Sequence, residues 1–320
     1  MAPSLLSSRL IFITGKGGTG KTTVALALGH AAARAGKRTI IATLDGSGSP
    51  DPQRQERQIS PRLYSIGISP QATMEEYLLL KLPGSTGQLL RQSKLFGAFA
   101  MATPGMRELL CMGKLWELAQ SERRSLDAVP YDVVIVDAPA SGHGAAMLRT
   151  PAMFADMVHS GPVAQQAQMI AATLRDRGFT SVLAVCTAEE MAVNETLQLS
   201  AALASARDPL ELSAVVLNCL AADRFSDQDV EMLREYQRLA AVRIALSRAA
   251  RARAERAQRQ RLQASFSDRI LTLPLLTGSE LDDSSLQLLG SMLLDQDPVP
   301  ETAAAQNQTE RLPLPQERQP

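Results

Sequence analysis

Eight consecutive residues near the start of the chain have the types and spacing needed to hold a polyphosphate. They read Gly15-Lys16-Gly17-Gly18-Thr19-Gly20-Lys21-Thr22 and lead into Thr23. The spacing fits the phosphate-binding loop G-x-x-x-x-G-K-[ST], in which glycines let backbone N–H groups surround phosphate oxygens. In such a loop Lys21 would reach the β- and γ-phosphates, and the Thr22 hydroxyl would hold Mg²⁺. The sequence therefore predicts a site for ATP and Mg²⁺, against the alternative of a glycine-rich turn without a ligand.

Lys16 is a second lysine in this loop, and one subunit does not need it to bind phosphate. One interpretation is a solvated loop lysine. The other is a catalytic lysine that points at the transferred phosphate of a facing subunit. The second interpretation predicts that two copies of the chain meet at their nucleotide sites.

Two aspartates follow predicted strands and are candidates for other parts of phosphoryl transfer. Asp137 ends the run Val133 to Val136, and in a sheet of this type such a strand end points into the ligand crevice. We assign Asp137 to Mg²⁺, through a water molecule, with a strand-end cap as the alternative. Asp45 follows the second strand and is the candidate for orienting the attacking water, with a plain turn aspartate as the alternative.

The segment from Ala138 to Gly144 is predicted to be a loop whose corners are set by Pro139 and Gly142. Ser141 or Gly142 could offer a backbone N–H to the γ-phosphate. His143 suits a conformational contact better than a general base, and the alternative is a loop histidine without a role.

Short β-branched runs alternate with long helical patterns along the chain. Such runs are typical of a parallel sheet that is covered by helices on both faces. The expected strands are Leu10–Ile13, Lys37–Thr43, Arg62–Ile68, Tyr131–Asp137, Ser181–Thr187, Ser213–Asn218 and Arg269–Leu273. We expect Arg62–Ile68 at an edge. Together these runs predict an α/β fold with a doubly wound, mostly parallel sheet.

A helix-rich insertion is expected from about residue 72 to 128, with a helix break at Thr103-Pro104-Gly105. Its methionines and alanines are either core residues or a flexible apolar surface for a partner. A further helix over Ala240–Gln263 carries seven arginines on a solvated face, for which nucleic-acid binding is the weaker interpretation. Residues 295–320 predict a disordered tail, so residues 1–294 would form one P-loop ATPase domain.

The composition argues against several classes of protein. Lys plus Arg and Asp plus Glu both number 33, so no overall charge attracts nucleic acid, and only 4% of the residues are aromatic. No apolar run is long enough to span a bilayer, and the phosphate loop begins too early to leave room for a signal peptide. The cysteines, Cys111, Cys186 and Cys219, are too dispersed for a disulfide framework. They predict a cytoplasmic protein, with Cys186 and Cys219 buried in strands.

Several motifs resemble one superfamily of ATPases. Lys16 to Thr22 is similar to the deviant phosphate loop of the arsenite-pump, tail-anchored-protein-targeting and MinD/ParA ATPases. Asp137 to His143 resembles the D-T-A-P-T-G-H segment of the arsenite-pump family, whereas MinD/ParA proteins generally lack the G-H element. Val215-Val216-Leu217-Asn218 and Leu273-Pro274-Leu275-Leu276 look like the adenine-side segments of the arsenite-pump family. The likeness runs from about Leu10 to Leu294.

The resemblance implies a homodimer in which two subunits enclose two nucleotides, Lys16 crosses the interface and Asn218 recognises adenine. Eukaryotic members bind zinc through a C-x-x-C pair that this chain lacks, so we expect no zinc. Arsenite binding is not expected either, because a soft metalloid needs clustered thiolates and the cysteines here are dispersed.

These observations predict a Mg²⁺-dependent ATPase that acts as a nucleotide-switched homodimer and binds a client protein through the helical insertion. Asp45 is followed by Gly46-Ser47-Gly48-Ser49, where the family usually reads D-P-A-H-S. This difference motivates an alternative, an ATP-binding regulatory protein with little turnover. The third hypothesis is a MinD/ParA-like positioning protein on membrane or DNA, against which stand the balanced charge and a tail without an amphipathic helix.

Overall fold

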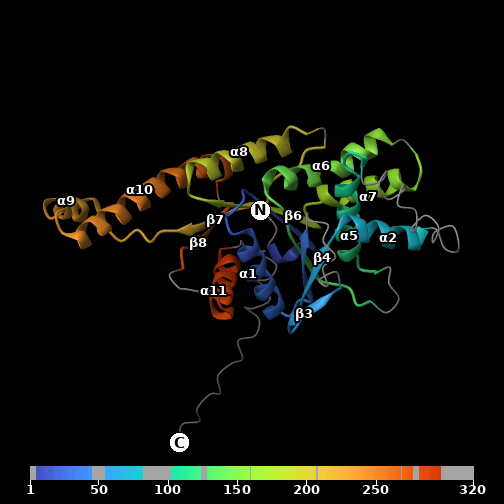
Figure 1. Cartoon of the computed structure of the whole chain (residues 1–320), viewed down its shortest axis with the longest axis horizontal. Helices are drawn as coiled ribbons and strands as arrows, with labels where there is room; N and C mark the ends of the chain where they lie inside the picture. Colours follow the sequence, from blue (N-terminus) through green and yellow to red (C-terminus); the bar gives the residue numbers. More distant parts are fainter. Residues whose placement is uncertain are drawn as a thin grey trace, which may run out of the picture.

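The computed structural model describes residues 5–44, 55–81, 102–123, 128–158, 160–206, 208–267, 269–276 and 281–296. These residues build one eight-stranded sheet with helices on both faces (Figure 1). The strands lie in the order β3-β4-β2-β5-β1-β6-β7-β8, and all neighbours are parallel except β3 and β4. The expected α/β fold with a doubly wound, mostly parallel sheet is thereby confirmed.

The strands correspond to the apolar runs of the sequence. Their bounds are β1 Leu10–Thr14, β2 Thr39–Leu44, β3 Arg57–Ser60, β4 Leu63–Ile68, β5 Val133–Asp137, β6 Thr180–Thr187, β7 Ala214–Leu220 and β8 Ile270–Pro274. The central strands β1 and β5 are buried along their whole length, because helices cover both of their faces. Alternate side chains of β1 therefore enter two separate cores, with Leu10 and Phe12 in one and Ile11 and Ile13 in the other.

Helices α1 and α11 cover one face of the sheet, and α5, α6, α7, α8 and the end of α10 cover the other (Figure 1). The helices are α1 Lys21–Arg34, α2 Pro70–Lys81, α5 Met106–Leu118, α6 Ser141–Met157, α7 Pro162–Arg175, α8 Glu190–Ala204, α9 Asp227–Glu235, α10 Ala240–Phe266 and α11 Asp283–Asp295. The single helix expected over Ala240–Gln263 is α10. Figure 1 shows that α9 and the first part of α10 project from this body.

One edge of the sheet differs from the prediction. Strand β3 pairs antiparallel with β4, so the run Arg62–Ile68 that was expected at the edge lies one strand inward. Three of the four β3 residues are exposed, and the strand reads Arg-Gln-Ile-Ser. An edge strand is held mainly by backbone pairing, so it can lack the apolar alternation that identifies a strand in a sequence.

The described part of the helical insertion comprises α2 and α5. Helix α5 begins after Gly105, whose φ of 77° is left-handed, in agreement with the helix break expected at Thr103-Pro104-Gly105. A Cβ at Gly105 would lie 2.9 Å from the Phe154 ring, so α5 packs closely on α6. Met74 and Met112 are buried, as expected of core residues. The bounds of the insertion and of the domain remain predictions, and the tail from residue 297 onward lies outside the described residues.

Gly290 allows α11 to pack closely against α1. A Cβ at this position would lie 2.4 Å from the carbonyl oxygen of Ala27. We expect Gly290→Ala to lower the free energy of unfolding by about 1–3 kcal/mol, because α11 must move away from α1. Gly113→Ala in α5 is the control, since its Cβ would meet nothing closer than 4.0 Å and alanine favours the helix. Urea unfolding measures both variants, and a Gly290→Ala protein as stable as the parent would contradict the close packing.

Candidate nucleotide-binding site

The loop between β1 and α1 requires glycine at several positions. Gly15, Gly18 and Gly20 have φ values of 139°, 82° and 91°, which other residues rarely adopt. A Cβ at Gly15 would lie 2.2 Å from the carbonyl oxygen of Val185, and one at Gly20 would lie 2.3 Å from Asn218 Nδ2. The loop thus curls tightly at the carboxyl end of β1, and α1 follows it directly. Loop amides and a helix N-terminus come together here, an arrangement that favours a phosphate ligand.

Lys21, the first residue of α1, reaches back across the loop. Its Nζ donates hydrogen bonds of 3.0 Å to the carbonyl oxygens of Gly15 and Lys16. Burial lowers the pKa of Lys21, and the negative charges of Asp137 and Glu195 oppose that shift. The Lys21 ammonium is therefore held inside the loop, where its charge can meet a phosphate.

Thr22 and Asp137 meet beside the loop although they lie 115 residues apart in the sequence. The Thr22 hydroxyl donates a 2.7 Å hydrogen bond to Asp137 Oδ2. Asp137 is buried at the end of β5, and burial raises the pKa of its carboxyl while the Thr22 hydrogen bond and the charge of Lys21 oppose the shift. Hydroxyl and carboxylate oxygens are the ligands that Mg²⁺ prefers, directly or through water. The residues present therefore fit a Mg²⁺ ion at this position.

Asn218 lies at the carboxyl end of β7 and connects the loop to a neighbouring cleft. Its Nδ2 donates to the carbonyl oxygen of Thr19 over 2.9 Å, and its Oδ1 accepts from the Cys219 backbone N–H at the same distance. The cleft has a volume of about 500 Å³ and is lined by the phosphate loop, Thr23, the ends of β7 and β8, and α11. Apolar walls with a few fixed polar groups are typical of a small-molecule site.

One wall of this cleft was missed by the sequence analysis. Leu275 and Leu276 were expected on the adenine side and do line the cleft, but Ser284 and Leu288 of α11 also line it. The pattern of α11 is that of any helix with one buried face. Nothing in that pattern indicates which part of the sheet the helix meets, so the sequence did not predict that Ser284 and Leu288 would line the cleft.

Lys16 behaves differently from Lys21. Its half-exposed side chain points toward α8, with Nζ 3.7 Å from the Sδ atom of Met191, and it does not bond the carbonyl oxygens of Gly15 and Lys16 that Lys21 contacts. Met191 itself is 70% exposed. The Lys16 side chain is thus not part of the hydrogen bonding that fixes the loop, although its carbonyl oxygen accepts from Lys21 Nζ and Thr19 Oγ1. Met191 is a neighbour of this side chain that the sequence did not indicate.

The segment after Asp137 is not the loop that the sequence predicted. Ser141 to His143 form the first turn of α6, and the His143 backbone N–H donates to the carbonyl oxygen of Ala140 over 3.0 Å. Ala140 has the extended backbone of a helix N-cap, and Gly142 does not interrupt the helix that follows. His143 is exposed. A Cβ at Gly144 would lie 2.5 Å from Thr14 Oγ1, so α6 packs directly on the strand that precedes the phosphate loop.

Comparison with known proteins identifies the family. The sequence profile of the anion-transporting ATPase family matches residues 8–162, which include the phosphate loop and Asp137. ATPase BagA of Mycobacterium tuberculosis is 30% identical over 251 residues, which cover 73% of this chain and 72% of that protein. The chain belongs to the anion-transporting ATPase family. ATPase ASNA1 homolog 1 of Paramecium tetraurelia is 30% identical over 148 residues, covering 44% of this chain and 43% of that protein.

Membership in the anion-transporting ATPase family confirms the resemblance drawn from the phosphate loop and from Asp137 to His143. A family of ATPases implies nucleotide binding, in agreement with the loop geometry. The roles of the individual residues remain predictions. Asp45, the candidate for orienting the attacking water, lies outside the described residues.

The cysteines of this family member lie on three separate elements. Cys111 of α5 and Cys186 of β6 are buried, and burial raises the pKa of their thiols to about 12 and about 11. Cys219 of β7 was expected to be buried, but it is half-buried and lines the cleft. Its φ of 59° is left-handed, and it lies where the pairing of β7 with β8 shifts register between Leu217 and Leu220. Among the residues that the structure describes, we find no helix both long and apolar enough for a membrane span.

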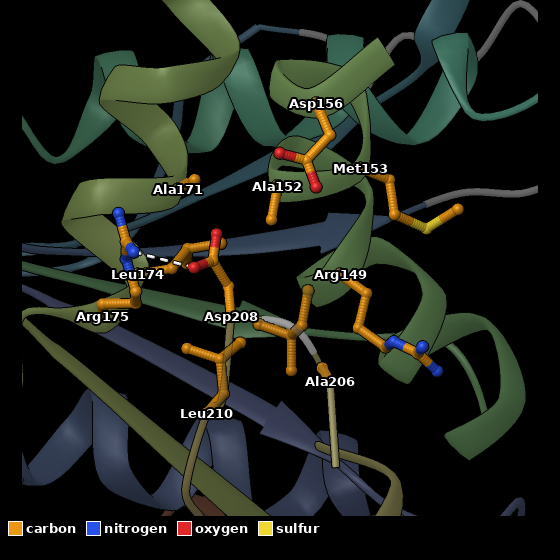
Figure 2. Close-up of a pocket in the computed structure, with 11 residues that line it drawn as sticks. Arg149, Ala152, Met153, Asp156, Ala171, Leu174, Arg175, Ala206, Asp208 and Leu210 are labelled. Carbon is orange, nitrogen blue, oxygen red and sulfur yellow. Dashed lines mark hydrogen bonds and ion pairs between the residues drawn. The ribbon is translucent and has the colours of Figure 1, made fainter. Parts of the chain in front are cut away.

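A second, smaller depression of about 110 Å³ lies between α6, α7 and the segment around Asp208 (Figure 2). Arg175 closes one side of it through a 2.8 Å ion pair with Asp208, and Arg149 and Asp156 line other parts. None of its lining residues belongs to the phosphate loop or to the cleft beside Asn218. This depression is therefore separate from the nucleotide site.

Proposed function

We propose that this chain is a Mg²⁺-dependent ATP hydrolase that acts as a nucleotide-switched homodimer. The observation that carries the proposal is the joint geometry of Lys21, Thr22 and Asp137 around a loop whose glycines leave its amides free to meet a phosphate. Phosphoryl transfer depends mainly on positioning and charge, and these residues supply both. Membership in a family of ATPases supports the same conclusion.

The residues divide the work as follows. Lys21 and the amides of the loop bind the β- and γ-phosphates. Thr22 and Asp137 hold Mg²⁺, which when bound neutralises charge on the phosphate oxygens. The base occupies the cleft beside Asn218, whose bond to the Thr19 carbonyl oxygen links base recognition to the loop. Asp45 orients the attacking water.

Lys16 acts on the nucleotide of the facing subunit in this proposal. Two arguments support a role outside its own loop: Lys21 already satisfies the loop carbonyls, and the Lys16 side chain lies half-exposed toward α8. A cation that enters from a partner would stabilise the charge that develops during transfer, as an arginine finger does. Hydrolysis would then require the dimer.

A path for the switch follows from the packing. Helix α6 begins three residues after Ala138, packs on Thr14 before the phosphate loop, and contacts α5 of the helical insertion through Phe154. A shift at the start of α6 would therefore reach the insertion, where we propose that a client protein binds. We place this cycle in the cytoplasm, in a single domain that spans residues 1–294.

Calorimetry and phosphate release test the proposal directly. The parent protein should bind ATP in the presence of Mg²⁺ and release phosphate over many turnovers, and Lys21→Ala should do neither. ATP binding without multiple turnovers would favour the alternative, a nucleotide-dependent regulatory protein. This alternative is motivated by the residues after Asp45, which differ from the usual family segment. An absence of ATP binding by the parent would refute both.

A further inference from the structure

The side chain of Thr14 carries a buried, unpaired hydroxyl directly before the phosphate loop. Thr14 is the last residue of β1 and is 0% exposed. Its Oγ1 atom has no hydrogen-bond partner within the described part of the chain. A buried polar group without a partner lowers the stability of the state that contains it. Such a group therefore favours any second state in which it finds a partner.

The other buried threonines do not share this property. Each of the five others in the described part of the chain donates its hydroxyl to a backbone carbonyl oxygen, and these five are Thr19, Thr39, Thr150, Thr180 and Thr196. Thr14 is thus the exception among the buried threonines that the structure describes, and it is the one that lies between the phosphate loop and α6.

The first turn of α6 lies against the Thr14 hydroxyl. A Cβ at Gly144 would lie 2.5 Å from Thr14 Oγ1 and 3.4 Å from the carbonyl oxygen of Pro139. The hydroxyl and this carbonyl oxygen therefore flank the same α carbon without being hydrogen bonded to each other. A displacement of the first turn relative to β1 can bring donor and acceptor within hydrogen-bond distance.

The strand holds Thr14 in place, whereas the first turn of α6 has an open outer side. Thr14 pairs with Ala184 of β6 in the middle of the sheet. At the start of α6, the N-cap residue Ala140 supplies no side-chain hydrogen bond, and both Gly142 and His143 are exposed. An exposed first turn without a side-chain cap moves more readily than a paired central strand.

ATP supplies a reason for this turn to move. The backbone N–H groups of Ser141 and Gly142 are the first of α6 and have no acceptor within the helix. They follow Asp137 at the carboxyl edge of the sheet, where the proposed function places the γ-phosphate. Amides at a helix N-terminus attract a phosphate, so the turn would move toward ATP and return when ADP remains.

We propose that Thr14 is a positioning residue for the γ-phosphate. When ATP draws the first turn of α6 toward the loop, the Thr14 hydroxyl donates to the carbonyl oxygen of Pro139. The inference rests on the proposed function, because it assigns a further residue to the same nucleotide switch. The hydroxyl is unpaired without ATP and paired with it, so it favours the ATP-bound state while acting through α6 and not on the nucleotide.

The variant Thr14→Val tests this inference, since valine keeps the shape of the side chain and removes the hydroxyl. Without nucleotide it should melt about 2–4 °C above the parent, because an unpaired buried polar group is gone. Calorimetry with Mg²⁺ should show that the affinity for adenylyl-imidodiphosphate, which is not hydrolysed, falls at least about tenfold, while that for ADP stays within about twofold. Thr14→Ser retains the hydroxyl and should keep the parent ratio of the two affinities.

Thr180→Val is the matched control. Thr180 begins β6 at the opposite edge of the sheet, and its hydroxyl donates to the carbonyl oxygen of Thr173 over 2.8 Å. This variant should melt below the parent, because a buried carbonyl oxygen loses its donor. Its ratio of affinities should equal that of the parent.

The outcomes separate this inference from the proposed function. An unchanged ratio of affinities in Thr14→Val would overturn the inference and leave the proposed ATPase standing. A melting temperature no higher than that of the parent would also overturn it, because the hydroxyl would then already be bonded, for example to a buried water molecule. A parent that bound neither ADP nor the analogue would refute the proposed function as well.

Discussion

Replacing Lys16 with alanine should leave ATP bound but slow phosphate release by roughly 10³- to 10⁵-fold, the order of effect that a cation supplied by a partner produces. The reason is that Lys21, not Lys16, lies across the loop and satisfies its carbonyls. The affinity for ATP, measured by calorimetry, should stay within about threefold of the parent because the loop amides and Lys21 are unchanged. Steady-state phosphate release at saturating ATP measures the loss.

Mixing two inactive variants tests whether Lys16 acts across the interface. A Lys16→Ala subunit keeps an intact nucleotide site, and a Lys21→Ala subunit keeps its Lys16. Random pairing makes half of the dimers mixed, with one complete site of two, so an equal mixture should recover about a quarter of the parent activity. No recovery would indicate that Lys16 acts within its own subunit or is a solvated lysine.

Asp137→Asn should raise the Mg²⁺ concentration needed for half-maximal activity at least tenfold and slow hydrolysis by roughly 10²-fold, since metal sites need a carboxylate charge. Asparagine keeps an oxygen that can accept the hydrogen bond from the Thr22 hydroxyl, which is 2.7 Å long in the parent. The substitution therefore removes the charge and retains the strand-end cap. Phosphate release titrated with MgCl₂ at fixed ATP measures both effects.

Asp132→Asn is the matched control for this substitution. Asp132 directly precedes the same strand, at the opposite edge of the sheet, and its carboxylate accepts the Arg38 backbone N–H at 2.7 Å. We expect its Mg²⁺ dependence to equal that of the parent. If Asp137→Asn also behaved like the parent, Asp137 would be a structural cap and the metal assignment would fail.

Much of the fold could be predicted because it depends on local patterns. Seven of the eight strands coincide with short, largely apolar runs, since strands covered on both faces are near-continuously apolar. The phosphate loop is contiguous, so its glycines, Lys21 and Thr22 could be assigned directly. Strand β3 and the helical start of α6 were not predicted. An edge strand is held mainly by backbone pairing, and α6 begins after Ala140, whose side chain cannot cap a helix, so neither has a clear signal in the sequence.

The sequence by itself determined that a phosphate loop stands between a buried strand and a helix, because a glycine-rich turn of fixed spacing encodes its own backbone geometry. Only the tertiary structure decided which distant groups meet that loop. Asn218 reaches the Thr19 carbonyl oxygen across 199 residues because β7 ends at the same sheet edge as β1. The exposure of apolar residues on α9 and the first part of α10 was decided in the same way, since a helical pattern cannot reveal where the sheet beneath it ends.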